Sequence, residues 1–348
     1  MKPCFDPLFT SSQDKDILQP APLIQIRIHK RVLRDMHIRY KAPDITNNSE
    51  WIAFRDEVQR VKEQKDILIL AHNYQSPEII EIADITGDSL ELAIHAQKAE
   101  ASVIIVCGVL FMAETAKLLN PDKKVLIPRK DAGCPLADQL TPEEIIEAKE
   151  AHPGAPFVIY VNSSAACKAE SDITCTSSNA VDIVRSLPGK TILFGPDSNL
   201  ASFVQKQVPE KEIIPVPHGG HCPIHNEMSV EDIKAAQKIG GYIVCHPECP
   251  SAVADAADIV LSTGKMKAAI ADHPVCHIFT ENSIQYLLQK AWPDKILYGL
   301  DTAICVDMQK TKPADLLTCI TEETNEIAID ERYASRARTA IEKMIANS

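Results

Sequence analysis

The sequence predicts an α/β protein built from three pseudo-symmetric repeats, each a small doubly wound αβα domain, around a central cavity. The first observation behind this prediction is that short apolar runs, such as ILILA at residues 67–71, alternate with helical patterns from about residue 50 to the end. Runs of this kind are typical of strands buried on both faces of a parallel sheet. The second observation is an internal repeat, and a fixed period of this size indicates copies of one supersecondary unit.

A tripeptide marks the repeat. Asp84-Ile-Thr, Asp172-Ile-Thr and Asp258-Ile-Val are spaced by 88 residues (172 − 84) and then by 86 (258 − 172). Equivalent residues stand at constant offsets from this aspartate, namely a strand-end residue twelve positions earlier (His72, Tyr160, His246), a hydroxyl five later (Ser89, Ser177, Thr263) and a cysteine 47 to 50 later (Cys134, Cys222, Cys305). Three offsets that hold in three copies indicate an internal triplication.

These offsets also predict where a site would form. In doubly wound sheets, ligands bind outside the carboxyl ends of the strands, and helix N-termini at the same edge can hold anions. Each marked residue falls at such a strand end or in the turn that follows it. We therefore expect three sheet edges to face one another around a pseudo-threefold axis and to bring all nine residues to one cavity.

The chain divides accordingly. We expect an N-terminal extension over residues 1–45, a first repeat over 46–140, a second over 141–225 and a third over 226–320. The first repeat should open with a helix over residues 51–65, for which Ser49 is a plausible N-cap. The tail, residues 321–348, contains a helical pattern at 327–345 that we expect to pack back on the first repeat.

Composition excludes several classes of function. A formal net charge of −12 argues against a nucleic-acid surface or an anionic membrane surface. No run reaches the roughly 18 apolar residues of a membrane span, and the N-terminus has no apolar core of a signal peptide. The sequence therefore predicts a cytoplasmic protein. Its eleven cysteines are then better explained by packing, metal ligation or catalysis than by disulfides.

Three thiolates at equivalent positions suggest a three-ligand metal site. The candidates are zinc with one open position and a 4Fe-4S cluster held at three of its irons. Cys222 and His225 could form a zinc pair, but the other two copies carry Ala137 and Met308 at the histidine position. Because only cysteine recurs in all three repeats, the pattern favours the cluster. The simpler alternative is that the three cysteines only pack in a core.

Several motifs together resemble the quinolinate synthase (NadA) family. They are AHNYQ (71–75), GDS (87–89), FMAETAKLLNPDK (111–123), AGCPLAD (132–138), YVNSSA (160–165), TCTSSNAV (174–181), FGPD (194–197), GHCPIH (220–225), HPECP (246–250), STG (262–264) and AICVDM (303–308). The resemblance runs from about residue 50 to the C-terminus. It implies three pseudo-symmetric α/β domains around one 4Fe-4S cluster whose three ligands fall on Cys134, Cys222 and Cys305, with one open iron that acts as a Lewis acid.

The resemblance also implies an activity. The family condenses iminoaspartate with dihydroxyacetone phosphate to give quinolinate, phosphate and water in NAD biosynthesis. An L-aspartate oxidase or dehydrogenase would supply the iminoaspartate. The residues that the motifs place on these two substrates are His72, Ser89, Tyr160, Asn162, Ser177, His246, Glu248 and Thr263.

Residue types suggest the chemical roles. Tyr74 and Glu248 can move protons, and His72 completes the predicted catalytic group. Two other functions stay open at this point. One is a cluster-dependent hydro-lyase of small carboxylates that does not use dihydroxyacetone phosphate, and the other is a zinc-binding module without turnover. A tyrosine and a glutamate in a polar cavity argue against the second.

Overall fold

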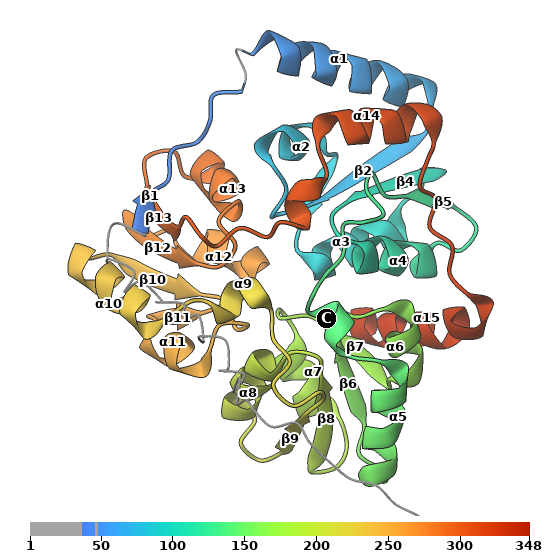
Figure 1. The fold of residues 1–348 in the computed structure, drawn as a ribbon, viewed down its shortest axis with the longest axis vertical. Helices are drawn as coiled ribbons and strands as arrows, with labels where there is room; N and C mark the ends of the chain where they lie inside the picture. The colour runs from blue at the N-terminus through green and yellow to red at the C-terminus, as the bar shows by residue number, and fades with distance from the viewer. Residues whose placement is uncertain (1–36, 46–47) are drawn as a thin grey trace, which may run out of the picture. The chain divides into compact units, whose positions relative to one another are not determined.

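The computed structural model describes residues 37–45 and 48–348, and within this part the strands form three separate sheets (Figure 1). The first sheet contains β2 (Ile67–His72), β3 (Ile85–Gly87), β4 (Val103–Cys107) and β5 (Lys124–Leu126). The second contains β6 (Phe157–Tyr160), β7 (Ile173–Cys175), β8 (Thr191–Gly195) and β9 (Glu212–Pro215). The third contains β10 (Tyr242–Cys245), β11 (Ile259–Val260), β12 (Val275–Phe279), β13 (Ile296–Leu300) and β1 (His37–Arg39).

The three sheets share one topology. Their strand orders are β3-β2-β4-β5, β7-β6-β8-β9 and β11-β10-β12-β13, so in each sheet the second strand of the repeat precedes the first, third and fourth. All of these pairs are parallel. This is the doubly wound arrangement predicted from the alternating pattern. Only β1, from the predicted N-terminal extension, departs from it, because it pairs antiparallel with β13 at the edge of the third sheet.

The aspartate that marks the repeat makes the same hydrogen bond in all three copies. Its carboxylate accepts the amide hydrogen of the residue fifteen positions earlier, near the start of the first strand, at 2.8, 2.7 and 2.7 Å in the three repeats in turn. The same aspartate also donates its own amide to the carbonyl of that residue, in each copy. The side chain therefore closes the crossover between the first two strands, which explains why this residue recurs at a constant offset.

Helices connect the strands and cover the sheets. The first repeat contains α1 (Ser49–Gln64), α2 (Pro77–Ile82), α3 (Ser89–Lys98), α4 (Leu110–Leu119) and the 3-10 helix η1 (Ala137–Gln139). The second contains α5 (Pro142–Ala151), α6 (Ala165–Glu170), α7 (Ala180–Ser186), α8 (Ser198–Gln207) and α9 (Pro223–Asn226). The third contains α10 (Val230–Ile239), α11 (Ser251–Ala256), α12 (Thr263–Ala269), α13 (Ile284–Ala291) and η2 (Met308–Lys310), and the tail adds α14 (Pro313–Glu322) and α15 (Glu331–Ala346).

Two local expectations are changed by the structure. Asn48, not Ser49, is the N-cap of α1, because its side-chain oxygen accepts the amide hydrogens of Glu50 and Trp51. The tail does pair with the first repeat, where Ile327 donates its amide to the Val125 carbonyl. However, α15 packs against α6 and β7 of the second repeat as well as against α4 of the first. The part of the predicted extension before residue 37 lies outside the described residues.

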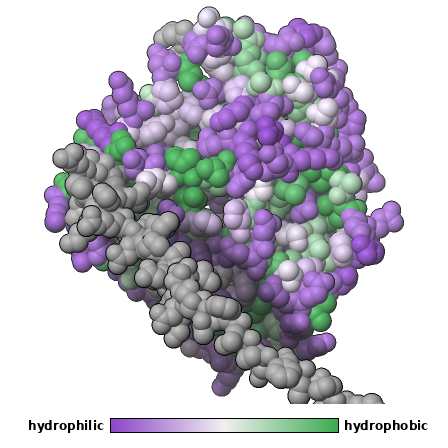
Figure 2. All heavy atoms as spheres, in the orientation of Figure 1, coloured by the Kyte–Doolittle hydropathy of each residue, from purple (hydrophilic) through white to green (hydrophobic). Residues whose placement is uncertain are grey.

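The core is apolar, and the surface is mainly hydrophilic on the face that Figure 2 shows. Apolar residues of the strands, such as Ile69, Ile104 and Phe194, are fully buried between the sheets and their helices. The face shown in Figure 2 is mainly hydrophilic, with small hydrophobic areas between purple ones. Within the described ranges, no helix combines the length and apolar character that crossing a bilayer requires.

Candidate active site

The predicted site residues surround one cavity. Its volume is about 690 Å³, open space at the mouth included. All twelve residues selected from the sequence line it, and they come from the three repeats: His72, Tyr74, Ser89, Cys134, Tyr160, Asn162, Ser177, Cys222, His246, Glu248, Thr263 and Cys305. The lining also includes residues that the sequence did not select as site residues, among them Asp88, Phe111, His225, Glu281 and Met308.

Each repeat brings its cysteine to the cavity in the same way. The amide three residues after the end of the third strand donates to the carbonyl two residues before the cysteine, from Leu110 to Ala132 at 2.8 Å in the first repeat. The equivalent bonds run from Ser198 to Gly220 and from Asn282 to Ala303, both at 2.7 Å. These bonds fasten each cysteine loop to the carboxyl edge of its own sheet.

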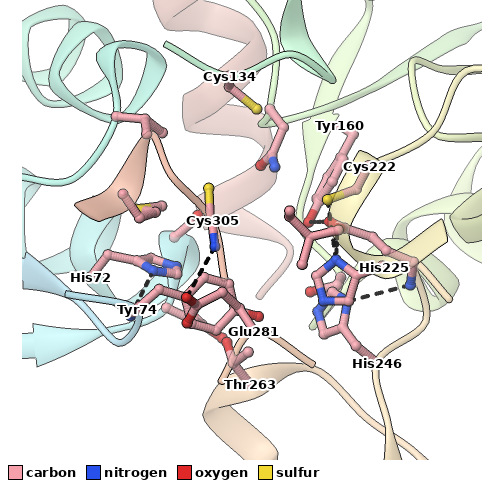
Figure 3. A pocket seen from close by; sticks show the side chains of 18 of the residues that line it. His72, Tyr74, Cys134, Tyr160, Cys222, His225, His246, Thr263, Glu281 and Cys305 are labelled. Carbon is pink, nitrogen blue, oxygen red and sulfur yellow. Dashed lines mark hydrogen bonds and ion pairs between the residues drawn. The ribbon is translucent and has the colours of Figure 1, made fainter. Parts of the chain in front are cut away.

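The three thiols form a set that suits a metal cluster. Figure 3 shows the sulfur atoms of Cys134, Cys222 and Cys305 turned toward the same space, and charge on one thiol is felt by another. Burial raises the pKa of Cys134 to about 12 and of Cys305 to about 11, and it raises the pKa of Cys222 well above its ordinary value. Such thiols stay protonated in neutral solution, so they become good ligands only when a metal displaces the proton.

Two buried carboxyl groups hold the cysteine backbones. Asp197 accepts the amide hydrogen of Cys222 at 3.2 Å, and Glu281 accepts that of Cys305 at 3.2 Å. The two acidic residues occupy equivalent positions, two residues after the end of β8 and β12. Burial raises the pKa of Glu281 to about 8, and burial together with the charge of Glu248 raises the pKa of Asp197.

Two histidines present a hydrogen-bond donor to the cavity. The Nδ1 atom of His72 accepts the Tyr74 amide at 3.2 Å, and the Nδ1 atom of His246 accepts the Glu248 amide at 3.3 Å. Burial lowers the pKa of His72 to about 4 and of His246 to about 3, so both rings are neutral near pH 7. In a neutral ring whose Nδ1 atom accepts, the proton is on Nε2, and each histidine can therefore donate one hydrogen bond.

A continuous hydrogen-bonded network joins the two cavity tyrosines. The Tyr160 hydroxyl donates to Glu248 at 2.5 Å, and the other Glu248 oxygen lies 2.8 Å from Nδ1 of His225. Nε2 of His225 lies 2.8 Å from the hydroxyl of Thr280, which in turn lies 2.6 Å from the hydroxyl of Tyr74. The network therefore runs through side chains of all three repeats.

The members of this network differ in acidity. Burial works to raise the pKa of Glu248, but the charge and hydrogen bond of His225, together with the Tyr160 hydroxyl, lower it on balance. Burial and the nearby Glu248 charge raise the pKa of Tyr160, and burial raises that of Tyr74. The site thus contains one carboxylate base between two phenols that keep their protons at neutral pH.

The cavity lining also offers donors for anions. Ser89 and Thr263 are the first residues of α3 and α12, and Ser177 lies in the turn before α7. Asp88 and Glu91 form a capping box that fixes the start of α3. Asn162 contributes a side-chain oxygen that is buried without a partner, which leaves it available to a bound ligand.

A second metal arrangement was possible from the sequence, and its atoms are close together. Ligand atoms of Cys222, His225 and Glu248 all lie within 4.8 Å of one another. However, Nδ1 of His225 is already within hydrogen-bond distance of both Cys222, at 3.2 Å, and Glu248. A single zinc ion here would have to displace these bonds and the one from Tyr160, whereas the three-cysteine set leaves the bonds of Glu248 to His225 and Tyr160 in place.

A family comparison identifies the chain. A sequence model of the family "Quinolinate synthetase A protein" matches residues 56–346. The chain belongs to this family. Its relatives include the quinolinate synthase of Pyrococcus furiosus, which is 45% identical over 294 residues, or 84% of this chain and 97% of the relative. The quinolinate synthases of Thermotoga maritima (42% identical, 83% and 98%) and Alkaliphilus metalliredigens (44%, 83% and 97%) match over a similar extent.

These comparisons confirm part of what the sequence predicts. The family and the three sheets confirm the predicted fold, and the family confirms the enzyme class, quinolinate synthase in NAD biosynthesis. The roles of individual residues, the ligands of the cluster and the boundaries of the repeats stay predictions. So do the cytoplasmic location and the supply of iminoaspartate by an aspartate oxidase or dehydrogenase.

Proposed function

We propose that the cavity condenses iminoaspartate with dihydroxyacetone phosphate to give quinolinate, phosphate and water. The observation that carries this proposal is that twelve residues, selected from separate parts of the sequence, line one cavity among the three sheets. The family supports the reaction, since its quinolinate synthases match nearly their whole length to this chain. Both substrates are small anions, and the cavity is lined by hydroxyls, neutral histidines and helix N-termini that can receive them.

The substrates can be placed by the chemistry of the lining. Carboxylate or phosphate oxygens would accept hydrogen bonds from Ser89, Ser177 and Thr263 and from the backbone amides beside them. The Nε2–H groups of His72 and His246 would donate to carboxylate or carbonyl oxygens from the other side. The unpartnered oxygen of Asn162 suits the imine N–H, because it can only accept a hydrogen bond.

Cys134, Cys222 and Cys305 would hold the 4Fe-4S cluster, which, when bound, supplies one iron free of protein ligands as a Lewis acid for a substrate oxygen or nitrogen. This assignment is supported by the equivalent placement of the three cysteines in the three repeats. All three are free thiols in the structure, as metal ligation requires.

The network from Tyr160 to Tyr74 would carry the protons. Glu248, a carboxylate at neutral pH, would take a proton from a substrate carbon next to a carbonyl group. Tyr74, a phenol of raised pKa, would give its proton to a departing hydroxyl group and recover it from His225 through Thr280. Tyr160 would hold one Glu248 oxygen, so that the other faces His225.

The decisive experiment is an anaerobic assay of quinolinate formation, paired with analysis of iron and sulfide. We expect about four irons and four sulfides per chain, as a 4Fe-4S cluster requires, and quinolinate only when both substrates are present. Cys305→Ser should lose iron and activity but keep the fold, whereas Cys276→Ser, at a buried cysteine outside the cavity lining, should keep both iron and activity. Hydration of a carboxylate without dihydroxyacetone phosphate would favour a hydro-lyase instead, and zinc in place of iron would favour the single-metal arrangement.

A further inference from the structure

The turns that carry the three cavity hydroxyls are joined by one hydrogen-bonded group of their neighbours. The hydroxyl of Ser178 donates to the Oδ2 atom of Asp88 at 2.9 Å and lies 2.7 Å from the hydroxyl of Ser262. Because the single hydroxyl hydrogen of Ser178 goes to Asp88, Ser262 must be the donor in the second bond. The bonds therefore run in one direction, from the third repeat through the second to the first.

The two carboxylate oxygens of Asp88 accept different hydrogen bonds. Its Oδ1 atom accepts the amides of Leu90 and Glu91, both at 3.0 Å, and so caps α3. Its Oδ2 atom is left for Ser178, and the third repeat approaches it so closely that a Cβ atom on Gly264 would lie only 2.7 Å away. Asp88 is only 6% exposed, so water offers little replacement for the Ser178 hydroxyl.

Ser178 is held to the third repeat at its backbone as well. The Nζ atom of Lys265, two residues after Thr263, donates to the Ser178 carbonyl at 3.0 Å. One residue of the second repeat thus has its side chain bound to the first and third repeats and its backbone bound to the third. Neither Ser178 nor Ser262 lines the cavity, whereas Ser177 and Thr263, the residues next to them, do.

We propose that Ser178 is a positioning residue that sets the spacing of the three hydroxyl turns, and thereby the affinity for the anionic groups of the substrates. The proposal rests on the proposed function in that these turns are taken to bind carboxylate and phosphate oxygens. Each turn belongs to a different sheet, so the distances among Ser89, Ser177 and Thr263 depend on contacts between repeats. The bonds of Ser178 to Asp88 and Ser262 are such contacts. The three bonded residues are the chain neighbours of the three cavity hydroxyl residues: Ser178 of Ser177, Asp88 of Ser89 and Ser262 of Thr263.

The test compares Ser178→Ala with Ser178→Thr, which keeps the hydroxyl, and with Ser186→Ala. Ser186 lies in the same repeat, but its hydroxyl bonds only within its own helix, to the carbonyl of Ile183. For each iron-loaded variant, KM and kcat are measured with both substrates, and the dissociation constant of quinolinate is measured by calorimetric titration. Iron content and the midpoint of thermal unfolding are recorded as well.

We expect Ser178→Ala to raise KM and the quinolinate dissociation constant about tenfold, the scale of a lost hydrogen bond to a charged group, with kcat within about twofold of the parent. Ser178→Thr should restore most of the affinity, and Ser186→Ala should match the parent. An unchanged affinity in Ser178→Ala, or a fall in kcat alone, would overturn the proposal. If Ser178→Ala does not fold, Ser262→Ala, which removes the hydrogen bond between the second and third repeats, must show the same loss of affinity.

Failure of the proposed function would look different. In that case the parent protein itself would form no quinolinate from the two substrates. The proposal for Ser178 would be overturned separately, by a parent protein that turns over normally and a Ser178→Ala variant that cannot be told from it.

Discussion

Replacing Lys168 by methionine should change how stability depends on pH. Lys168, in α6, is fully buried, its Nζ atom donates to the carbonyl of Ser163, and it lies 5.5 Å from the centre of the Phe111 ring. Burial lowers the pKa of its ammonium group from 10.5 to about 8, and the nearby charge of Glu114 only partly opposes this effect. A lysine of this kind makes the folded state bind protons less readily than the unfolded chain.

The sign and size of the effect follow from this difference. Between pH 8 and 10.5 the folded protein has released this proton and the unfolded chain still holds it, so the free energy of unfolding rises with pH. At about 1.4 kcal/mol for each pKa unit, the full change is about 3 kcal/mol. Below pH 8 the whole destabilisation is present. Methionine cannot titrate, so Lys168→Met should lack this rise.

Urea unfolding at several pH values from 7 to 10 measures the effect. We expect the difference in unfolding free energy between the parent and Lys168→Met to shift in favour of the parent by about 2 to 3 kcal/mol across this range. Lys190→Met, at an exposed position of the same repeat, should run parallel to the parent. Parallel curves for the parent and Lys168→Met would refute the reasoning, because other titrating groups are common to both proteins. The difference in unfolding free energy between the two proteins at pH 7 does not test this reasoning, because methionine also leaves the Ser163 carbonyl without its donor.

Other predictions concern the network, the repeat and the metal. Thr280→Val removes the hydroxyl in the middle of the proton network, and Thr280 is outside the cavity lining. In steady-state kinetics, kcat should therefore fall by about 100-fold or more with KM little changed, and an unchanged kcat would contradict this prediction. Asp258→Ala leaves the Ile243 amide without its acceptor and should reduce the unfolding free energy by about 1 to 3 kcal/mol, whereas Asp258→Asn, which keeps an acceptor oxygen, should lose less in urea unfolding. Loading iron and sulfide into metal-free protein near pH 8 should release about three protons from the cavity thiols in a pH-stat, in addition to the roughly four that hydrosulfide ions lose on becoming cluster sulfides, because the raised pKa values keep all three thiols protonated beforehand. Release of only the roughly four hydrosulfide protons would show that the thiols are already ionised.

The sequence could predict the residues that the three repeats share. A constant or nearly constant offset from the marking aspartate selects one position in each copy, and equivalent positions in equivalent sheets come to the same edge. That is why Cys134, Cys222 and Cys305 could be placed together before the fold was known. The marking aspartate itself was only a reference point in the sequence, and the structure gives it a physical reason, the hydrogen bond that closes each crossover.

The residues that sequence reasoning missed are those at which the repeats differ. His225 was considered only as a possible zinc partner of Cys222, and Thr280 was not singled out. Thr280 has Gly108 and Pro196 as its counterparts, so no threefold pattern could mark it. Its contact with His225 joins residues 55 positions apart on different repeats, which depends on how the sheets face one another. The only sequence signal for this contact was the position of His225 three residues after Cys222.

The differences between copies also explain how an acidic protein can receive two anions. Two residues after the third strand, the repeats carry Val109, Asp197 and Glu281. Val109 and Glu281 line the cavity, and Asp197 contacts the Cys222 amide. Val109 brings no charge, burial raises the pKa of Glu281 to about 8, and burial with the charge of Glu248 raises that of Asp197, while oxygens of both residues accept the cysteine amides. Glu248 differs because His225 stabilises its charge. A triplicated fold thus supplies three equivalent positions for the thiols, while divergence at neighbouring positions disfavours charge on Asp197 and Glu281 and favours it on Glu248, the residue proposed as the base.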